Sequence, residues 1–399
     1  MGQSKSINTF VFLFFVAILF AMGAEAYDND MVRYGSYFVE ILLILYALFQ
    51  SYWGDIVIKN KYVLICAVII ILNYLFSPYD HNYSDLLKFF GYLCCFKYGY
   101  TLSRQYNDLK VNKLLLALVV FFPIFMVAVY DDSYIKNTFF TNPNTFVYTG
   151  LSMGLLYLIC NDAKPKAFWI AWIIVGLYVL TCTSLGVVVA ILMAFLILNI
   201  RMSHIPYLLL SLIVLFIVIK YIDIPLFVRI RDVFNLWSSM SSSDLANLND
   251  INYYELNSRV EINGEREDVG SSVWRLAHWL ELFLDYIKNI WTIPFGLGVG
   301  YSVYKTDFLA HNDFLFILTE MGVVVFIFFI RIITTLFKGM KNEGKFIYFI
   351  LAMFFYHFTE NLIQTFPPNA ILYFVVGWCM YKYCDGNQKN LTYESFTNK

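Results

Sequence analysis

Arg275, the glycine-rich run 296–300 and His311 carry potential chemistry within one polar stretch of an otherwise apolar chain. A guanidinium binds phosphate oxygens in pairs and keeps its charge. A glycine-rich turn can offer backbone N–H donors to an anion. An imidazole can take a proton from a hydroxyl nucleophile near neutral pH. Together these features indicate a site where an alcohol attacks a phosphate-bearing substrate.

Each feature also has a purely structural interpretation. Arg275 could lie along a membrane surface with its charge in water, and the glycines could simply form a loop. His311 could cap the helix that follows it, and His278 could face the membrane surface. Residue type alone leaves these alternatives open.

Composition predicts that transmembrane helices position these residues. Hydrophobic residues make up 60% of the 399 and charged residues 14%, whereas soluble domains carry about a quarter charged. Apolar runs of about 17–25 residues can each cross a bilayer, and helices satisfy every backbone polar group there. We therefore expect an all-α polytopic membrane protein with about twelve transmembrane helices. The expected spans are 7–24, 33–52, 61–77, 85–103, 113–130, 145–160, 167–182, 184–200, 205–222, 313–331, 345–363 and 369–384.

The distribution of Lys and Arg predicts that both termini are cytoplasmic. The short loops on one side hold most of these residues, and those on the other side hold only Arg33 and Lys136. The first span, followed by Ala24-Glu25-Ala26, also fits a signal peptide, but its apolar run is longer than is usual for one. We expect an uncleaved first helix.

The chain divides into three parts. Residues 1–222 hold helices one to nine, residues 223–312 form a large outer loop, and residues 313–399 hold helices ten to twelve and a tail. A loop of that length is usually functional or partly ordered. Its start, 238–243, is typical of a linker, and its residues 272–291 have the periodicity of an amphipathic helix lying on the membrane. Twelve acids against seven bases in the loop suit sugars better than nucleic acid.

Metal-ligand spacing does not occur in the sequence. The five histidines show no zinc-ligand pattern, and none of the seven cysteines lies in the large loop. We expect no metal and no cofactor.

The stretch that begins at Arg275 resembles the signature region of the O-antigen polymerase and ligase superfamily. It continues through Pro294-Phe295-Gly296-Leu297-Gly298 to His311-Asn312-Asp313-Phe314-Leu315 and then Glu320-Met321-Gly322. Thr141-Asn142-Pro143-Asn144 is similar to a second feature of that superfamily. Relatives often carry an arginine in the turn that corresponds to 181–186, where this chain has Leu185.

The resemblance implies a GT-C-like, metal-independent glycosyltransferase at the periplasmic face of the bacterial inner membrane. Such a polymerase moves a growing glycan from undecaprenyl diphosphate onto a hydroxyl of an incoming lipid-linked repeat unit. A ligase moves the finished glycan onto lipid A-core. Arg275 would hold the leaving diphosphate, and His311 would orient or deprotonate the acceptor hydroxyl. The implied partners are the undecaprenyl diphosphate-linked oligosaccharide, membrane lipid and a chain-length regulator protein.

Eight further residues are candidate substrate contacts: Arg259, Arg266, Asn312, Gly298, Asn144, Lys88, His357 and Glu360. Arg259 or Arg266 could replace the arginine missing near Leu185. Asn144 could instead cap the sixth span, and Lys88 could meet a diphosphate from the outer end of the fourth.

Three functions remain open at this point. The Asn-Pro-Asn segment and the missing arginine favour the polymerase over the ligase. A polysaccharide transporter would also suit twelve spans with both termini inside. The chain has no internal repeat and its large loop is placed asymmetrically, which argues against a transporter.

Overall fold

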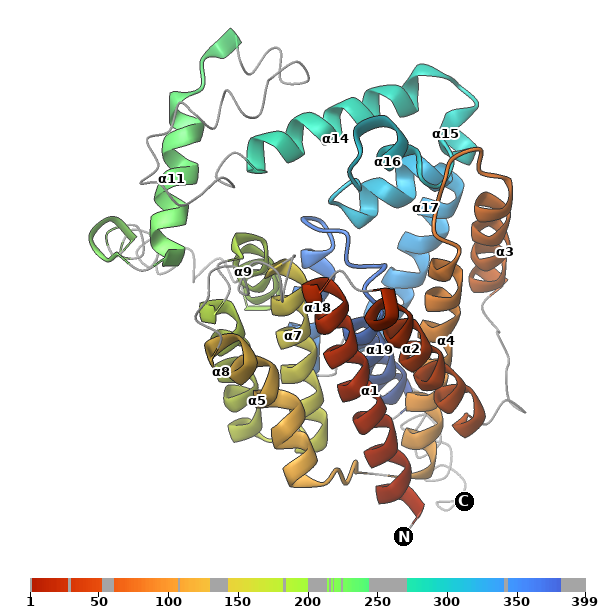
Figure 1. Cartoon of the computed structure of the whole chain (residues 1–399), viewed down its shortest axis with the longest axis vertical. Coiled ribbons are helices and arrows are strands. Elements are labelled where there is room, and N and C mark those ends of the chain that lie inside the picture. The colour runs from red at the N-terminus through yellow and green to blue at the C-terminus, as the bar shows by residue number, and fades with distance from the viewer. Residues whose placement is uncertain are drawn as a thin grey trace, which may run out of the picture.

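The computed structural model of the chain is an assembly of α-helices (Figure 1). It describes residues 2–27, 30–51, 61–106, 108–129, 143–181, 184–199, 225–243, 271–340 and 344–381, with a few residues between 214 and 223. Helices, turns and loops make up these residues, and no strand occurs among them. The expected all-α class is therefore confirmed.

The helices of the bundle follow the predicted spans closely. They are α1 (Gly2–Tyr27), α2 (Asp30–Gln50), α3 (Lys61–Phe76), α4 (Ser84–Gln105), α5 (Lys113–Val129), α7 (Pro143–Cys160), α8 (Pro165–Thr181), α9 (Leu185–Asn199), α17 (Asp313–Met340), α18 (Phe346–Tyr356) and α19 (Phe366–Cys379). Every predicted span except the ninth overlaps one of them, although α18 ends seven residues before the span predicted at 345–363 and α17 runs nine residues past the one predicted at 313–331. Most of the ninth, 205–222, lies outside the described residues.

The apolar helices are compatible with a membrane setting. By length and composition, two of the described helices could cross a bilayer, and these are α2 and α17. Eight other described apolar helices are shorter, with 10–17 residues each. The number of spans stays a prediction.

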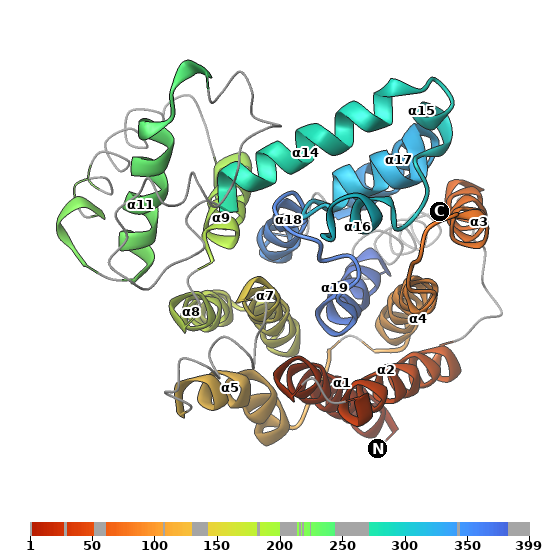
Figure 2. The same cartoon turned by 45° about the horizontal axis from the view of Figure 1, so that its top comes forward.

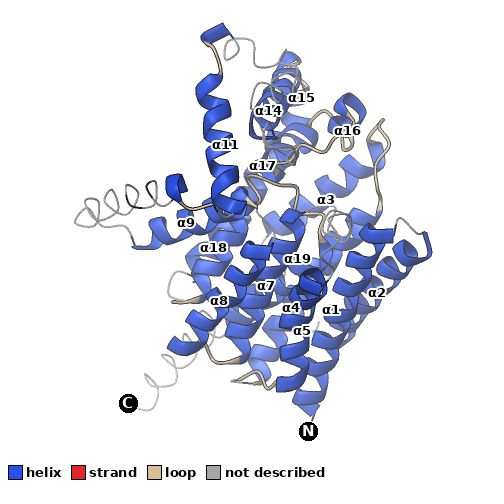
Figure 3. Ribbon diagram, turned by 60° about the vertical axis from the view of Figure 1, so that its left-hand side comes forward, coloured by secondary structure: helices blue, strands red, loops and turns tan. Residues whose placement is uncertain are grey.

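Four helices of the predicted outer loop lie at the end of the bundle remote from the N-terminus (Figures 1 and 3). They are α11 (Pro225–Ser239), α14 (Ser271–Lys288), α15 (Thr292–Phe295) and α16 (Tyr301–Thr306). The amphipathic helix expected at 272–291 is α14, which lies across the end of the bundle (Figure 2). The linker expected from residue 238 is wrong at its start, because α11 continues through Ser239.

Most of the apolar face predicted for α14 is exposed. Leu276, Leu280, Phe283, Leu284 and Ile287 are each more than a third exposed. Leu282 and Val273 are buried and hold the helix to its neighbours. An exposed apolar face on such a helix suits a membrane surface.

The centre of the bundle depends on close contact between α4 and α19. A Cβ on Gly99 of α4 would lie 2.0 Å from the carbonyl oxygen of Phe374. A Cβ on Gly377 of α19 would likewise lie 2.0 Å from the carbonyl oxygen of Phe96. Glycines on both helices therefore allow the two backbones to touch, as small residues do between membrane helices.

We predict that Gly99→Ala and Gly377→Ala each destabilise the protein by about 1–3 kcal/mol, the usual cost of overpacking a core. The measurement is the Tm of the detergent-purified chain. Gly176→Ala in α8 is the matched control, because nothing lies within 4 Å of the added Cβ. An unchanged Tm in both test variants would contradict the packing argument.

Candidate active site

Glu360 joins the two catalytic candidates of the sequence. Its carboxylate lies just beyond α18, and the residue as a whole is 1% exposed. Nη2 of Arg275, on α14, donates to Glu360 Oε1 at 2.7 Å. Nδ1 of His311, in the loop before α17, lies 3.4 Å from Glu360 Oε2. Arg275 and His311 therefore meet at one buried carboxylate, although two short helices and several turns separate them along the chain.

His311 is held in a conformation that ordinary residues rarely adopt. Its φ is 49°, and a non-glycine residue in this left-handed region stores strain that the surroundings must offset. Its ring lies edge-on to the indole of Trp274, with 5.2 Å between ring centroids. The indole N–H of Trp279 donates to the carbonyl of Ala310 at 2.7 Å. Helix α14 thus fixes both the ring and the backbone of His311.

His278 ties α14 to the same loop. It is 4% exposed, its Nε2 lies 3.2 Å from the carbonyl oxygen of Leu309, and its ring stacks on Trp274. Because a carbonyl only accepts, Nε2 carries the proton. Burial lowers the pKa of His278 to about 4, although the bond to Leu309 opposes that shift. His278 is therefore a neutral structural residue that faces the protein, and the expected membrane-facing position is wrong.

Asn144 supports Glu360 from the other side. Its Nδ2 donates to Glu360 Oε1. Its Oδ1 accepts from the hydroxyl of Ser184 at 2.6 Å and from that of Tyr356 at 2.9 Å. The amide therefore orients the carboxylate, and both of its ends have protein partners. Ser184 belongs to the 181–186 turn, so the turn lies beside the site and brings a buried hydroxyl next to Leu185.

Asn312 and Asp313 fasten the start of α17. The side-chain oxygen of Asn312 accepts from the N–H of Leu315 at 3.0 Å, which is an N-cap bond. Oδ2 of Asp313 accepts the N–H groups of Leu362 and Ile363 at 2.8 Å each. These bonds tie the His311 loop to the segment that follows Glu360. Asn312, expected to contact substrate, has its side-chain oxygen committed to the helix.

His357 lies beneath the site. Its Nδ1 bonds to Asp313, and its Nε2 lies 3.0 Å from the hydroxyl oxygen of Tyr148. That hydroxyl donates its one hydrogen to Oδ1 of Asn369 at 2.6 Å. Nε2 of His357 must therefore donate to Tyr148, while Nδ1 holds the ring against Asp313. His357 is a support and not the cavity wall that the sequence led us to expect.

The backbone N–H groups of the glycine turn donate to acceptors within the protein. The N–H of Leu297 donates to Thr319 O at 2.7 Å, that of Gly298 to Glu320 O at 3.1 Å, and that of Gly300 to the Glu320 carboxylate at 2.7 Å. A Cβ on Gly296 would lie 2.2 Å from Glu320 O. The turn therefore packs α15 against α17 near Gly322, where a non-helical backbone (φ 87°) interrupts that helix. The expectation that Gly298 offers its N–H to a phosphate is wrong in this geometry.

Lys88, another candidate, bonds within its own helix. Nζ of Lys88 pairs with Asp85 of the same helix at 3.0 Å, and its side chain is 14% exposed. Its charge is therefore balanced within α4. Arg259 and Arg266 lie outside the described residues.

The arrangement can support proton transfer beside an anion. The side chains of Arg275 and His311 are 23% and 25% exposed, whereas that of Glu360 is 2% exposed. Glu360 fixes Nδ1–H of His311, which leaves Nε2 to accept a proton. Among the described residues Nε of Arg275 is a buried donor without an acceptor. Among all the residues that the structure describes, no group of three or more His, Cys, Asp or Glu is arranged to hold a metal.

No protein-family model matches the chain, and no curated protein is similar to it at a significant level. The resemblance to the polymerase and ligase superfamily therefore stays a prediction. The argument for function depends on the geometry of the site.

Sequence reasoning missed the polar residues that support the site. They are Tyr148, Ser184, Asp313, Tyr356 and Asn369. A polar side chain within an apolar run is one available signal, because such a group needs a partner in a bundle. That signal cannot name the partner, which lies on another helix.

We predict that the contact between α14 and the His311 loop weakens as pH falls from about 6.5 toward 4. An undocked His278 binds a proton near its ordinary pKa of about 6.5, while the docked one does so near 4. Protonation therefore favours the undocked state in that window, and the contact is fully present above it. Hydrogen exchange of residues 308–312, corrected for intrinsic rate, measures the effect.

His278→Gln is the control, because its amide can still donate to Leu309 and does not titrate. The variant should have a flatter pH profile than the native chain. Profiles that coincide would remove His278 as the cause.

Proposed function

We propose that the chain is a membrane glycosyltransferase of the O-antigen polymerase kind. It would transfer a growing glycan from undecaprenyl diphosphate onto a hydroxyl of an incoming lipid-linked repeat unit. The observation that carries the proposal is the convergence of Arg275 and His311 on the buried carboxylate of Glu360. An anion-binding cation and a base at one accessible place are what glycosyl transfer from a diphosphate requires.

The reaction uses each of the two residues once. The acceptor hydroxyl attacks the anomeric carbon, and the new C–O bond forms as the bond from that carbon to the diphosphate oxygen breaks. Nε2 of His311 takes the hydroxyl proton. The bond electrons leave with the diphosphate, and the guanidinium of Arg275 neutralises the growing charge. The products are the lengthened lipid-linked glycan and undecaprenyl diphosphate.

Glu360 acts through the other two residues. It accepts Nδ1–H of His311, which orients the ring and stabilises the imidazolium formed when Nε2 takes the proton. It also limits the rotamers of Arg275, so less entropy is lost when the guanidinium binds a diphosphate. Glu360 is therefore a positioning residue, with Asn144 behind it.

The proposal places the chain across the bacterial inner membrane with about twelve helices. Both termini would be cytoplasmic, and α14 would lie on the periplasmic surface. The described part of the 181–186 turn brings the Ser184 hydroxyl to Asn144. Because the Asn-Pro-Asn segment is present and Leu185 stands where relatives often carry an arginine, we favour the polymerase over transfer to lipid A-core. A chain-length regulator is the partner protein we expect.

We predict that His311→Ala lowers the rate of glycan extension about 10²–10⁴-fold, the usual loss when a general base is removed. Arg275→Gln should lower it about 10²–10³-fold, since one charge-stabilising group is lost. Purified protein with synthetic lipid-linked repeats gives both rates. Arg231→Gln is the control. Arg231 lies on α11 and bonds to Asp223 and to the backbone carbonyls of Ile219 and Lys220, none of which is a candidate site residue.

Cells that lack the gene separate the alternatives. Loss of the polymerase should leave one repeat unit on lipid A-core, whereas loss of a ligase would leave none. A purified protein that moves lipid-linked glycans without lengthening them would point to a transporter. Native rates in both His311→Ala and Arg275→Gln would overturn the catalytic assignment.

A further inference from the structure

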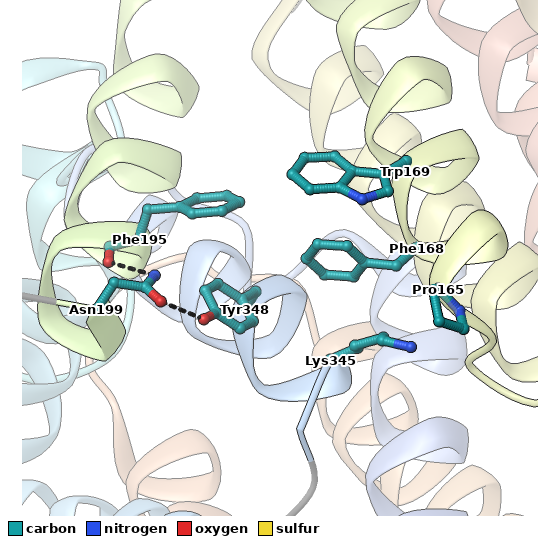
Figure 4. Close-up of a pocket in the computed structure, with 7 residues that line it drawn as sticks. All are labelled: Pro165, Phe168, Trp169, Phe195, Asn199, Lys345 and Tyr348. Carbon is teal, nitrogen blue, oxygen red and sulfur yellow. Dashed lines mark hydrogen bonds between the residues drawn. The ribbon is translucent and has the colours of Figure 1, made fainter.

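An aromatic cavity lies between α8, α9 and the start of α18 (Figure 4). Its volume is about 480 Å³, within the range of about 300–1,000 Å³ typical of small-molecule sites. Phe168 and Trp169 of α8 point toward Phe195 of α9, and Lys345 lies below them (Figure 4). Trp169 is 63% exposed, so the cavity opens on its side.

The cavity is far from the candidate active site. Lys345 immediately precedes α18 and His357 immediately follows it. A helix of this length separates its two ends by roughly 16 Å. The proposed membrane orientation puts the Lys345 end on the cytoplasmic side, where the short loops that hold most of the Lys and Arg are expected.

Lysine gives the cavity its charge. Nζ of Lys345 donates to the carbonyl of Ala163 at 2.6 Å, which leaves two ammonium hydrogens for another acceptor. That bond brings Lys345 to the segment that also carries Lys164 and Lys166. Asp162 is the one acid in residues 161–166, and it pairs with Lys164 at 3.7 Å. Among the residues that line the cavity, Lys345 therefore supplies the positive charge.

The hydroxyl of Tyr348 and the amide of Asn199, which also line the cavity, bond to the protein. The hydroxyl of Tyr348 donates to Asn199 Oδ1 at 2.7 Å, and Asn199 Nδ2 donates to Phe195 O at 2.9 Å. A sugar would find few free partners there. A ligand with an apolar chain and one anionic group fits both the aromatic wall and Lys345.

We propose that this cavity binds an anionic phospholipid of the cytoplasmic leaflet. An acyl chain lies against Phe168, Trp169 and Phe195, and the headgroup phosphate bonds to Lys345. Anionic lipids give that leaflet a negative surface potential, which attracts basic residues near the membrane. The inference uses the membrane orientation of the proposed function but none of its chemistry.

Native mass spectrometry of the full-length, delipidated chain tests the proposal. Phosphatidylglycerol and phosphatidylcholine with identical acyl chains are the two probes. The native chain should bind phosphatidylglycerol more tightly. Lys345→Gln should weaken that binding about fivefold, the typical effect of one lysine near a charged surface, and leave phosphatidylcholine unchanged. Lys110→Gln, at an exposed lysine before α5 that does not line the cavity, is the matched control.

Trp169→Ala tests the acyl chain. It should weaken the binding of both lipids. Because the Trp169 side chain is exposed, we expect the variant to fold like the native chain. If inorganic phosphate, at the same concentration as phosphatidylglycerol, displaced that lipid, the cavity would be a site for a simple anion. That result would overturn the lipid assignment. Equal binding of the two lipids by the native chain, or equal phosphatidylglycerol binding by Lys345→Gln and the native chain, would also overturn it.

Binding and catalysis fail separately in these experiments. A chain that binds phosphatidylglycerol through Lys345 but never extends a glycan would keep this inference and refute the polymerase. A chain that extends glycans but shows no lipid preference would keep the polymerase and refute this inference. Recovery of the native chain in the aqueous fraction of cells would refute both.

Discussion

A buried carboxylate organises the candidate active site. Removing Glu360 from water costs several kcal/mol unless its charge is paired and its oxygens are hydrogen-bonded. Arg275, His311 and Asn144 supply those partners from three separate segments. Each segment is therefore tied to the place where Glu360 sits. The same bonds leave Arg275 and His311 partly exposed, so the carboxylate that is buried positions both side chains for a ligand.

The supports of this centre form a second polar layer. Asp313 accepts two backbone N–H groups and bonds to the ring of His357, whose other nitrogen bonds to Tyr148. Such a layer is stabilising only when each donor finds an acceptor. It fixes the start of α17 and the end of α18 relative to each other, which sets the separation of His311 and Glu360. The geometry of the candidate site thus depends on hydrogen bonds that lie beneath it.

The two ends of the molecule differ in chemistry in a way that suits an enzyme of lipid-linked substrates. One end holds an arginine and a histidine over a buried acid, covered by an amphipathic helix. The other end holds an aromatic cavity with a lysine at its mouth. Helix α18 connects them, with Lys345 before its first residue and His357 after its last. Anchoring by lipid at one end would leave the other free for transfer chemistry.

The sequence by itself determined the all-helical class and most of the helix positions, because hydrophobic periodicity is a local property, and residue type named Arg275 and His311 as candidates. It also marked Glu360 and Asn144 as candidates, yet described them as substrate contacts. Only the tertiary structure decided that these two hold the site together, that Glu320 occupies the turn at Gly298, and that Asp313 pairs with His357. The reason is physical: a buried polar group is defined by its partner, and the partners here lie on helices that are distant in sequence.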